Sequence, residues 1–368
     1  MKKIYISKPK ISSYANKLVN EAISTTWISS IGKNVNLFEK KFKVISGSKY
    51  NSTCSSGYAA LHLALSALNI KAGDEVIMPS LSFIATANAV YNNGAKAIFA
   101  DINENDWTIN IDDCEKKITK KTKAIIAVHL YGFPCDMDRL LKLCKKKKLF
   151  LIEDVAEAHG TKIGKKLVGS YGDISCYSFY ANKIITTGEG GMCSSNNKSL
   201  IKKINVLKDH GISRAKTYFS YAAGYNYRMT NIQASIGLEQ IKNFKNLINE
   251  KKKIYLRYLQ NLKEEINSKK IAIQKSNLQK INLSIWLFSI RVVNKRKSIL
   301  KLQKLLNNNN IETRPVFYPM EKFAYLNYLE KNKNSEKISK SSISLPTGYN
   351  LKNEEIDKIC KIIKNFLK

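Results

Sequence analysis

The chain has 368 residues, of which 44% are hydrophobic and 25% are charged, and its formal net charge is +33. This length exceeds what one compact core usually supports, so we expect two domains, and the composition excludes wholesale disorder. No apolar run approaches the ~18–20 residues of a membrane span, and residues 1–17 lack the apolar stretch of a signal peptide. We therefore expect a cytoplasmic protein that does not enter a membrane.

The large positive charge does not by itself indicate a nucleic-acid-binding protein. Only seven of the 62 basic residues are arginine, whereas a nucleic-acid surface more often combines arginine with interleaved aromatic residues. The densest lysine runs, 145–148 and 251–253, fall on predicted amphipathic helices, where a solvated face is the simpler explanation. We expect no nucleic-acid partner and only a weak attraction to anionic ligands.

The cysteines and histidines favour neither a metal site nor a disulfide framework. The seven cysteines are odd in number and form no CxxC pair, and the four histidines are not spaced as metal-binding pairs. We expect reduced, mostly buried thiols and no metal site.

Helical and strand-like patterns alternate between residues 56 and 195. In chain order they predict a helix over 58–68, a strand in 73–80, a helix over 83–93, a strand over 95–101, a strand over 123–132, a helix over 136–147, and strands over 149–160 and 173–180. Strands separated by helices require crossover connections, and strands this apolar must be covered on both faces. The pattern predicts a large α/β/α domain with a mainly parallel mixed sheet.

The pattern changes after about residue 230. It predicts a long helix over 232–263, an antiparallel-type strand over 283–293, and helices over 298–307, 321–330 and 354–368. Grouped helices around a strand of this kind predict a smaller C-terminal α+β domain. We assign the large domain to residues 1–245 and the small domain to residues 246–368.

Polar residues follow the apolar runs at five places: 55–57, 80–83, 129–132, 154–159 and 178–191. Ligands in open α/β sheets bind beyond the carboxyl ends of the strands. Because these segments should converge on one rim of the sheet, we predict the functional site there.

Two residues on this rim, Lys183 and Asp154, form a chemically meaningful pair. Lys183 follows a predicted buried strand, and Asp154 ends another, where a carboxylate is costly unless it meets a cation. Pyridoxal phosphate requires such a pair, since a lysine binds its aldehyde and an aspartate keeps its pyridine nitrogen protonated. It also requires a phosphate cup at a helix N-terminus, which residues 55–57 supply unless they form only a helix cap.

Several strings of the sequence resemble the DegT/StrS group of fold-type-I, pyridoxal-phosphate-dependent nucleotide-sugar aminotransferases. They are TWISSIG (26–32), SSGYAALHLAL (55–65), GDEVIMPSLSFIATANA (73–89), HLYGFPCDMD (129–138), IEDVAEAHG (152–160), NKIITTGEGGM (182–192), GYNYRMTNIQASIG (224–237) and IETRPVFYP (311–319). The resemblance covers nearly the whole chain. TWISS, GYNYRMTN and ETRPVFYP are similar to the perosamine-forming branch of the group.

The resemblance implies a set of cofactor-binding residues. Lys183 would bind the cofactor covalently and act as the acid and base, Asp154 would pair with the pyridine nitrogen, and Glu157 would stand where many relatives have Gln near the ring hydroxyl. The phosphate would be held by Gly57, Tyr58, Ala59 and Ser178, and Asn226 would reach the phosphate of the neighbouring subunit's cofactor in a homodimer with shared sites. Phe83 would stack on the ring, although its spacing alone fits a core residue equally well.

One residue departs from the family pattern. Tyr58 stands where the group usually has Thr or Ser, whose hydroxyl binds the phosphate, and a tyrosyl group is too long to make the same bond. We therefore expect only the backbone N–H of Tyr58 to take part.

Substrate contacts are expected from residues that the matching strings place near the site. They are Ser29, His129, His159, Arg228 and Arg314. Arg314 would bind the substrate diphosphate or sugar, or would instead be a structural salt-bridge partner, and the sequence leaves both open.

The resemblance implies the transfer of an amino group from glutamate to C4 of a nucleotide-linked 4-keto-6-deoxy sugar. The leading expectation is GDP-4-keto-6-deoxymannose as substrate and GDP-perosamine as product. The alternatives are a dTDP-4-keto-6-deoxyglucose or UDP-sugar aminotransferase and, remotely, a non-enzymatic basic nucleic-acid-binding protein that retains the fold.

Overall fold

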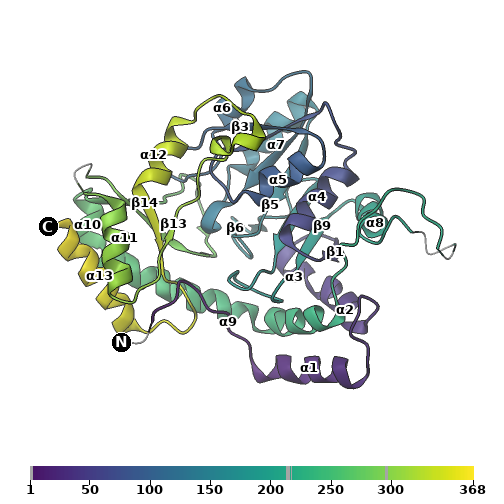
Figure 1. The fold of residues 1–368 in the computed structure, drawn as a ribbon, viewed down its shortest axis with the longest axis horizontal. Coiled ribbons are helices and arrows are strands. Elements are labelled where there is room, and N and C mark those ends of the chain that lie inside the picture. Colours follow the sequence, from purple (N-terminus) through teal and green to yellow (C-terminus); the bar gives the residue numbers. More distant parts are fainter. Residues whose placement is uncertain (1–2, 213–215, 217, 295–296) are drawn as a thin grey trace.

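A computed structural model describes residues 3–212, 216, 218–294 and 297–368. A seven-stranded sheet in the order β1-β9-β8-β5-β4-β2-β3 forms the centre of its larger part (Figure 1). The strands are β1 Tyr50–Cys54, β2 Glu75–Pro79, β3 Lys96–Ala100, β4 Thr122–Val128, β5 Phe150–Asp154, β8 Ile174–Ser178 and β9 Gly191–Ser195. Strand β9 runs antiparallel to β1 and β8 on either side of it, and the other pairings of these strands are parallel. The predicted mainly parallel mixed sheet is confirmed.

Helices cover both faces of this sheet. Along β2, Val76 and Met78 belong to one buried apolar cluster and Ile77 to another, because successive side chains of a strand point to opposite faces. The first cluster includes residues of α4 (Gly57–Ala67), α5 (Ala85–Asn92) and α8 (Lys198–Leu207), and the second includes residues of α6 (Ile111–Lys116) and α7 (Met137–Lys147). The predicted α/β/α layering is therefore confirmed.

A third cluster lies against β8 and β9, on the opposite face of these strands from the first cluster. It joins α2 (Lys33–Lys41) and α3 (Lys43–Ser46) to the first half of α9 (Asn231–Asn261). Helix α1 (Ser13–Ser24) lies along α9, as Figure 1 shows. No helix or strand was predicted from the sequence for residues 13–46.

The C-terminal part contains a four-stranded antiparallel sheet in the order β10-β12-β14-β13. Its strands are β10 Ile271–Ile273, β12 Phe288–Val292, β13 Arg314–Pro315 and β14 Ser342–Leu345, and its helices are α10 Lys263–Asn267, α11 Ile299–Asn308, α12 Lys333–Ser341 and α13 Asn353–Leu367. Its core includes residues from the second half of α9. The predicted boundary at 245/246 falls inside α9, so one continuous helix serves both parts, and the division itself stays a prediction.

A small three-stranded sheet links the two parts. It consists of β11 (Ile281–Asn282), β6 (Lys162–Ile163) and β7 (Lys166–Leu167), and β11 pairs with β6. This pairing fixes the segment before β12 against the larger part.

Two sequence predictions are wrong. Residues 321–330 form no α-helix but two short 3-10 turns, Met320–Lys322 and Ala324–Leu326. Here Glu321 accepts a hydrogen bond from Ser80 Oγ at 2.5 Å and one from the backbone N–H of Asn332 at 3.1 Å, so tertiary contacts override the helical pattern. Lys251, predicted on a solvated face, is buried with 2% of its surface exposed.

No helix among the described residues is long and apolar enough to cross a membrane.

Candidate active site

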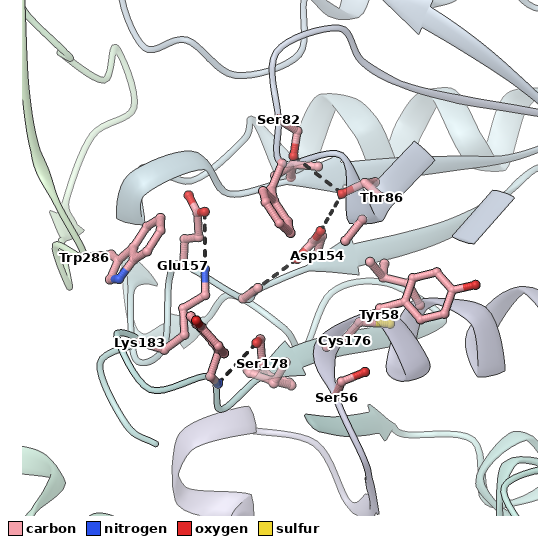
Figure 2. Close-up of a pocket in the computed structure, with 18 of the residues that line it drawn as sticks. Ser56, Tyr58, Ser82, Thr86, Asp154, Glu157, Cys176, Ser178, Lys183 and Trp286 are labelled. Atoms are coloured by element: carbon pink, nitrogen blue, oxygen red, sulfur yellow. Dashed lines mark hydrogen bonds and ion pairs between the residues drawn. The ribbon is translucent and has the colours of Figure 1, made fainter. Parts of the chain in front are cut away.

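A cavity of about 460 Å³ opens beyond the carboxyl ends of β5 and β8. It is bordered by the start of α4, the loop before α5, the loop after β8 and a few residues of the C-terminal part (Figure 2). The cavity is lined by eight of the residues predicted from the sequence: Gly57, Tyr58, Phe83, Asp154, Glu157, Ser178, Lys183 and Arg314. Its size is that of an ordinary small-molecule site.

Asp154 is the last residue of β5 and has only 7% of its surface exposed. Its Oδ2 accepts a hydrogen bond from Thr86 Oγ1 at 2.9 Å, and its Oδ1 accepts one from the backbone N–H of Ala156 at 3.1 Å. Burial raises the pKa of this carboxyl, and the hydrogen bonds from Ala156 and Thr86 oppose that rise. A cationic group in the cavity would therefore be stabilised by this carboxylate.

Lys183 and Glu157 point toward one another across the cavity (Figure 2). The distance from Lys183 Nζ to Glu157 Oε1 is 3.4 Å, and Glu157 Oε2 accepts a hydrogen bond from the backbone N–H of Tyr131 at 2.9 Å. Burial raises the pKa of Glu157, and the charge of Lys183 opposes that rise. The Lys183 amine also lies 3.7 Å from the ring centroid of Trp286.

The first turn of α4 forms the opposite end of the cavity. The N-cap residue Ser56 accepts a hydrogen bond through Oγ from the backbone N–H of Ala59 at 3.0 Å, so that N–H already has a partner. A Cβ on Gly57 would lie 2.6 Å from Ser178 Cβ, so the close approach of these two segments requires glycine. A helix N-terminus against a hydroxyl-bearing strand end suits an anion such as a phosphate.

The side chain of Tyr58 is directed away from Lys183 (Figure 2). Its hydroxyl accepts a hydrogen bond from Asn92 Nδ2 at 2.7 Å, and its ring lies 5.8 Å from the ring of His62. This placement agrees with the expectation that the Tyr58 hydroxyl does not replace the usual Thr or Ser.

These residues fit pyridoxal phosphate on three independent counts. One cavity contains an amine, a buried carboxylate at the end of a strand, and a helix N-terminus with room for an anion. The first turn of α4 approaches Ser178 so closely that only glycine fits at position 57, which brings the helix N-terminus beside the Ser178 hydroxyl. Phe83, with 55% of its surface exposed, stands at the cavity and remains the predicted stacking residue.

Both predicted histidines lie outside the cavity lining. His129 is buried; its Nδ1 accepts a hydrogen bond from the backbone N–H of Cys135 at 3.1 Å, so its Nε2 donates to Glu153 at 3.2 Å. His159 packs against the rings of Tyr177 and Phe179, and burial lowers its pKa to about 3. In this conformation both histidines support the walls of the site rather than facing its interior.

Ala59, Ser29, Asn226 and Arg228 also lie outside the lining of this cavity. The carbonyl of Ser29 accepts the N–H of Asn231 at 2.7 Å. Asn226 is exposed, and its Oδ1 accepts a hydrogen bond from Arg228 Nη2 at 2.8 Å, while Arg228 Nη1 donates to Asp209 at 2.7 Å. The expectation that Asn226 serves a neighbouring subunit stays a prediction.

Sequence reasoning missed Thr86, Trp286 and Phe317, which all line the cavity. Thr86 lies inside a helical pattern, and Trp286 lies at an apolar strand pattern where a tryptophan is typical of a core. Only Thr86 had a usable signal, since it closely follows the polar segment 80–83 at the rim.

Comparison with known proteins gives a consistent result over the whole chain. The model of the DegT/DnrJ/EryC1/StrS aminotransferase family matches residues 9–364. A relative named GDP-perosamine synthase from Escherichia coli O157:H7 is 42% identical over 100% of this chain and 99% of its own. Another protein of that name, from Vibrio cholerae, is 38% identical over 99% of both chains.

Solved structures of aminotransferases are also similar to this chain. An aminotransferase from Psychrobacter cryohalolentis is similar with a TM-score of 0.92 and 28% identity, over 97% of both chains. A putative sugar aminotransferase from Streptococcus pneumoniae in its PLP form is similar with a TM-score of 0.90 and 26% identity, over 100% of this chain and 99% of that one.

Proposed function

This chain belongs to the DegT/DnrJ/EryC1/StrS aminotransferase family, and we propose that it transfers an amino group from glutamate to C4 of GDP-4-keto-6-deoxymannose, which gives GDP-perosamine. The chain is a pyridoxal-phosphate-dependent aminotransferase of nucleotide sugars. Two relatives that span the full chain carry the name of the perosamine-forming enzyme, and this supports the choice of substrate. The observation that carries the proposed chemistry is the convergence of Lys183, Asp154 and the start of α4 on one cavity.

The cofactor supplies an electron sink when it is bound, because its protonated ring withdraws electrons from the reacting carbon. The proposed role of Asp154 is to keep the ring nitrogen protonated, since a buried carboxylate stabilises a cation beside it. Lys183 would attach the cofactor and, once free, use Nζ to take a proton from the reacting carbon of the amino donor and, in the separate second half of the reaction, to give one to C4 of the sugar. Glu157, held by the backbone N–H of Tyr131, would orient that amine.

Arg314 is the proposed contact for the charged part of the substrate. It lines the cavity from β13, and 44% of its side chain is exposed. Its ion pair with Glu312 is long, with 3.9 Å from Nη2 to Oε1, so this contact is beyond hydrogen-bonding distance and does not use up the donors of the guanidinium. A guanidinium suits a diphosphate because it donates in a planar fork.

We further propose a homodimer in which Asn226 of each subunit contributes to the other subunit's site. Asn226 is exposed and does not line the cavity of its own chain. Large apolar side chains are also exposed, including Trp27 (59%), Ile31 (77%) and Tyr221 (63%), and an isologous interface would bury such groups. The seven free cysteines, all buried, support a reducing, cytoplasmic location.

Product analysis tests the substrate. The protein is incubated with pyridoxal phosphate, glutamate and, in separate reactions, the 4-keto-6-deoxy sugars of GDP, dTDP and UDP, and the products are followed by mass spectrometry. We expect amination of the GDP sugar at the highest rate. Preferred amination of the dTDP or UDP sugar would overturn the substrate but keep the aminotransferase. The absence of any aminated product would overturn the proposed reaction.

A further inference from the structure

Lys251, on α9, is a fully buried lysine whose observed polar contacts are all with oxygens of uncharged groups. Its Nζ donates to the carbonyl of Thr347 at 2.7 Å, to the carbonyl of Trp286 at 3.2 Å and to Thr347 Oγ1 at 3.3 Å. These three oxygens match the three donors of the protonated amine, and the neutral amine can still donate to two of them. Nζ also lies 4.9 Å from the ring centroid of Tyr349. Burying a charge away from a carboxylate is costly, so this position is expensive for stability alone.

The two segments that Lys251 binds both reach the loop that carries Lys183. Trp286 Nε1 donates to the carbonyl of Asn182 at 2.7 Å, and the Tyr349 hydroxyl donates to the carbonyl of Ile184 at 2.6 Å. The residues on either side of Lys183 are therefore each held by an aromatic side chain. Lys251 contacts the backbone carbonyl of Trp286 and the ring of Tyr349.

The ring of Trp286 has a second contact with the same loop. Its face lies 3.7 Å from Lys183 Nζ, and its own carbonyl accepts from both Lys251 and Thr347 Oγ1, the latter at 2.9 Å. Lys251 and Thr347 thus hold the backbone of Trp286, while the ring itself contacts the loop through Nε1 and its face. Figure 2 shows Trp286 beside the Lys183 amine, across from Glu157.

We propose that Lys251 is a positioning residue that fixes the place of the Lys183 amine by holding Trp286 and Tyr349 against the carbonyls of Asn182 and Ile184. This inference rests on the proposed role of Lys183 as the cofactor-binding lysine. Lys251 does not line the cavity, and it acts only through the two aromatic side chains. A displacement of a reacting group by about 1 Å can cost as much as 10²-fold in rate.

The first experiment compares Lys251→Met with Lys252→Met. Methionine keeps the length of the side chain and removes its donors, and Lys252 is an exposed neighbour on the same helix. The measurements are kcat and KM with the proposed substrates and, separately, the rate at which the apoprotein takes up pyridoxal phosphate covalently, followed by borohydride trapping. We expect Lys251→Met to lower kcat and the uptake rate by about tenfold or more, with KM little changed, and Lys252→Met to match the wild type.

A mutant cycle tests whether Lys251 acts through the two aromatic residues. In a protein that already carries Trp286→Phe and Tyr349→Phe, the aromatic donors to the carbonyls of Asn182 and Ile184 are absent. Lys251→Met should then change the uptake rate by less than about twofold, because coupled residues are not additive. If Lys251→Met keeps its full effect in that background, or only lowers the melting temperature of an otherwise wild-type enzyme, the inference is wrong.

Two further variants make every outcome decisive. If Lys251→Met does not fold, Thr347→Val removes one donor to the Trp286 carbonyl without changing side-chain shape, and it should slow uptake by a smaller factor that disappears in the same double-Phe background. Unchanged uptake in Thr347→Val would then overturn the inference.

If Lys183→Ala still takes up the cofactor covalently, the proposed role of Lys183 fails. If Lys183→Ala blocks uptake and Lys251→Met does not slow it, only the role of Lys251 fails.

Discussion

The rim of the large sheet and the junction where α9 meets the C-terminal part, at Lys251, Trp286 and Thr347, each contain a lysine shielded from solvent. The surroundings of the two lysines are opposite. At the rim, Lys183 meets the carboxylate of Glu157 at 3.4 Å, and its amine faces a cavity. At the junction, Lys251 meets only carbonyl and hydroxyl oxygens among the described residues, and it is sealed from solvent. The first arrangement keeps an amine available for chemistry, whereas the second uses an amine as a fixed hydrogen-bond donor.

In a chain so rich in lysine, the surroundings of a lysine therefore determine its role, and its residue type alone does not. At the rim, Lys183 can exchange Glu157 for a ligand that enters the cavity, since its amine faces that cavity. At the junction, Lys251 cannot, because its amine is already bound to backbone and hydroxyl oxygens that hold the C-terminal part to α9. Loss of either lysine should therefore impair the enzyme in a different way.

The largest effect is expected at the rim. Lys183→Ala should lower turnover by about 10⁴-fold or more, because it removes both the covalent attachment and the mobile acid and base. The remaining site, with Asp154 and the start of α4, should still bind the cofactor without a covalent bond. Steady-state rates and equilibrium dialysis measure the two properties. A variant that transaminates at nearly the wild-type rate would remove the basis of the proposed mechanism.

The next effect concerns the carboxylate that shares the rim. Asp154→Asn keeps the size of the side chain but cannot stabilise a protonated ring nitrogen, so kcat should fall on the order of 10²–10³-fold. The amide oxygen can still accept the N–H of Ala156, and the amide NH2 can donate to the Thr86 hydroxyl in place of the bond that Thr86 now donates, which limits the structural damage. Activity within a few-fold of wild type, at equal cofactor content, would mean that another group holds the ring nitrogen.

At the junction, Lys251 should affect the stability of the protein in addition to its proposed effect on kcat and cofactor uptake. Burial lowers the pKa of Lys251 to about 7, whereas an unfolded lysine titrates at about 10.4. Between these values the unfolded chain binds a proton that the folded chain does not, so the Lys251 contribution to the free energy of unfolding rises with pH, by up to several kcal/mol.

Urea unfolding at pH 7, 8, 9 and 10 measures this contribution as the difference between wild type and Lys251→Met. The difference should grow in favour of the wild type as the pH rises through this window. Lys252→Met, which changes an exposed lysine of the same helix, should show no such trend. Parallel profiles for wild type and Lys251→Met would show that Lys251 titrates normally.

The smallest effects separate two neighbours at the start of α4. Gly57→Ala should weaken the binding of pyridoxal phosphate by roughly tenfold, because its Cβ would lie 2.6 Å from Ser178 Cβ and push the two segments apart. Tyr58→Phe should change the dissociation constant by less than about twofold, because the hydroxyl is bound to Asn92 and not to the cavity. A loss for Tyr58→Phe as large as that for Gly57→Ala would place the Tyr58 hydroxyl on the phosphate.

The same contrast explains how far the sequence alone could go. Asp154 and Lys183 could be predicted because each is a polar residue that follows a buried strand, and parallel strands bring their carboxyl ends together. Lys251 was wrongly predicted to lie on a solvated face, since its environment comes from residues 35 and 96 positions away along the chain. Trp286 was missed for a related reason: a tryptophan in an apolar stretch gives no local sign that its ring faces a reactive amine.

The wrong helix at 321–330 has a comparable origin. The carboxylate of Glu321 binds Ser80 Oγ and the backbone N–H of Asn332, and neither contact can be read from the local pattern. Local patterns therefore located the sheet and the reactive pair, while the contacts between the two parts of the chain required the structure.

One measurement tests the central claim most directly. The holoenzyme is reduced with borohydride and digested, and the pyridoxyl group is located among the lysines by peptide mass spectrometry. The account predicts that the group is found on the peptide that contains Lys183, in NKIITTGEGGM (182–192). A pyridoxyl group on any other lysine, or on none in a fully loaded enzyme, would contradict it.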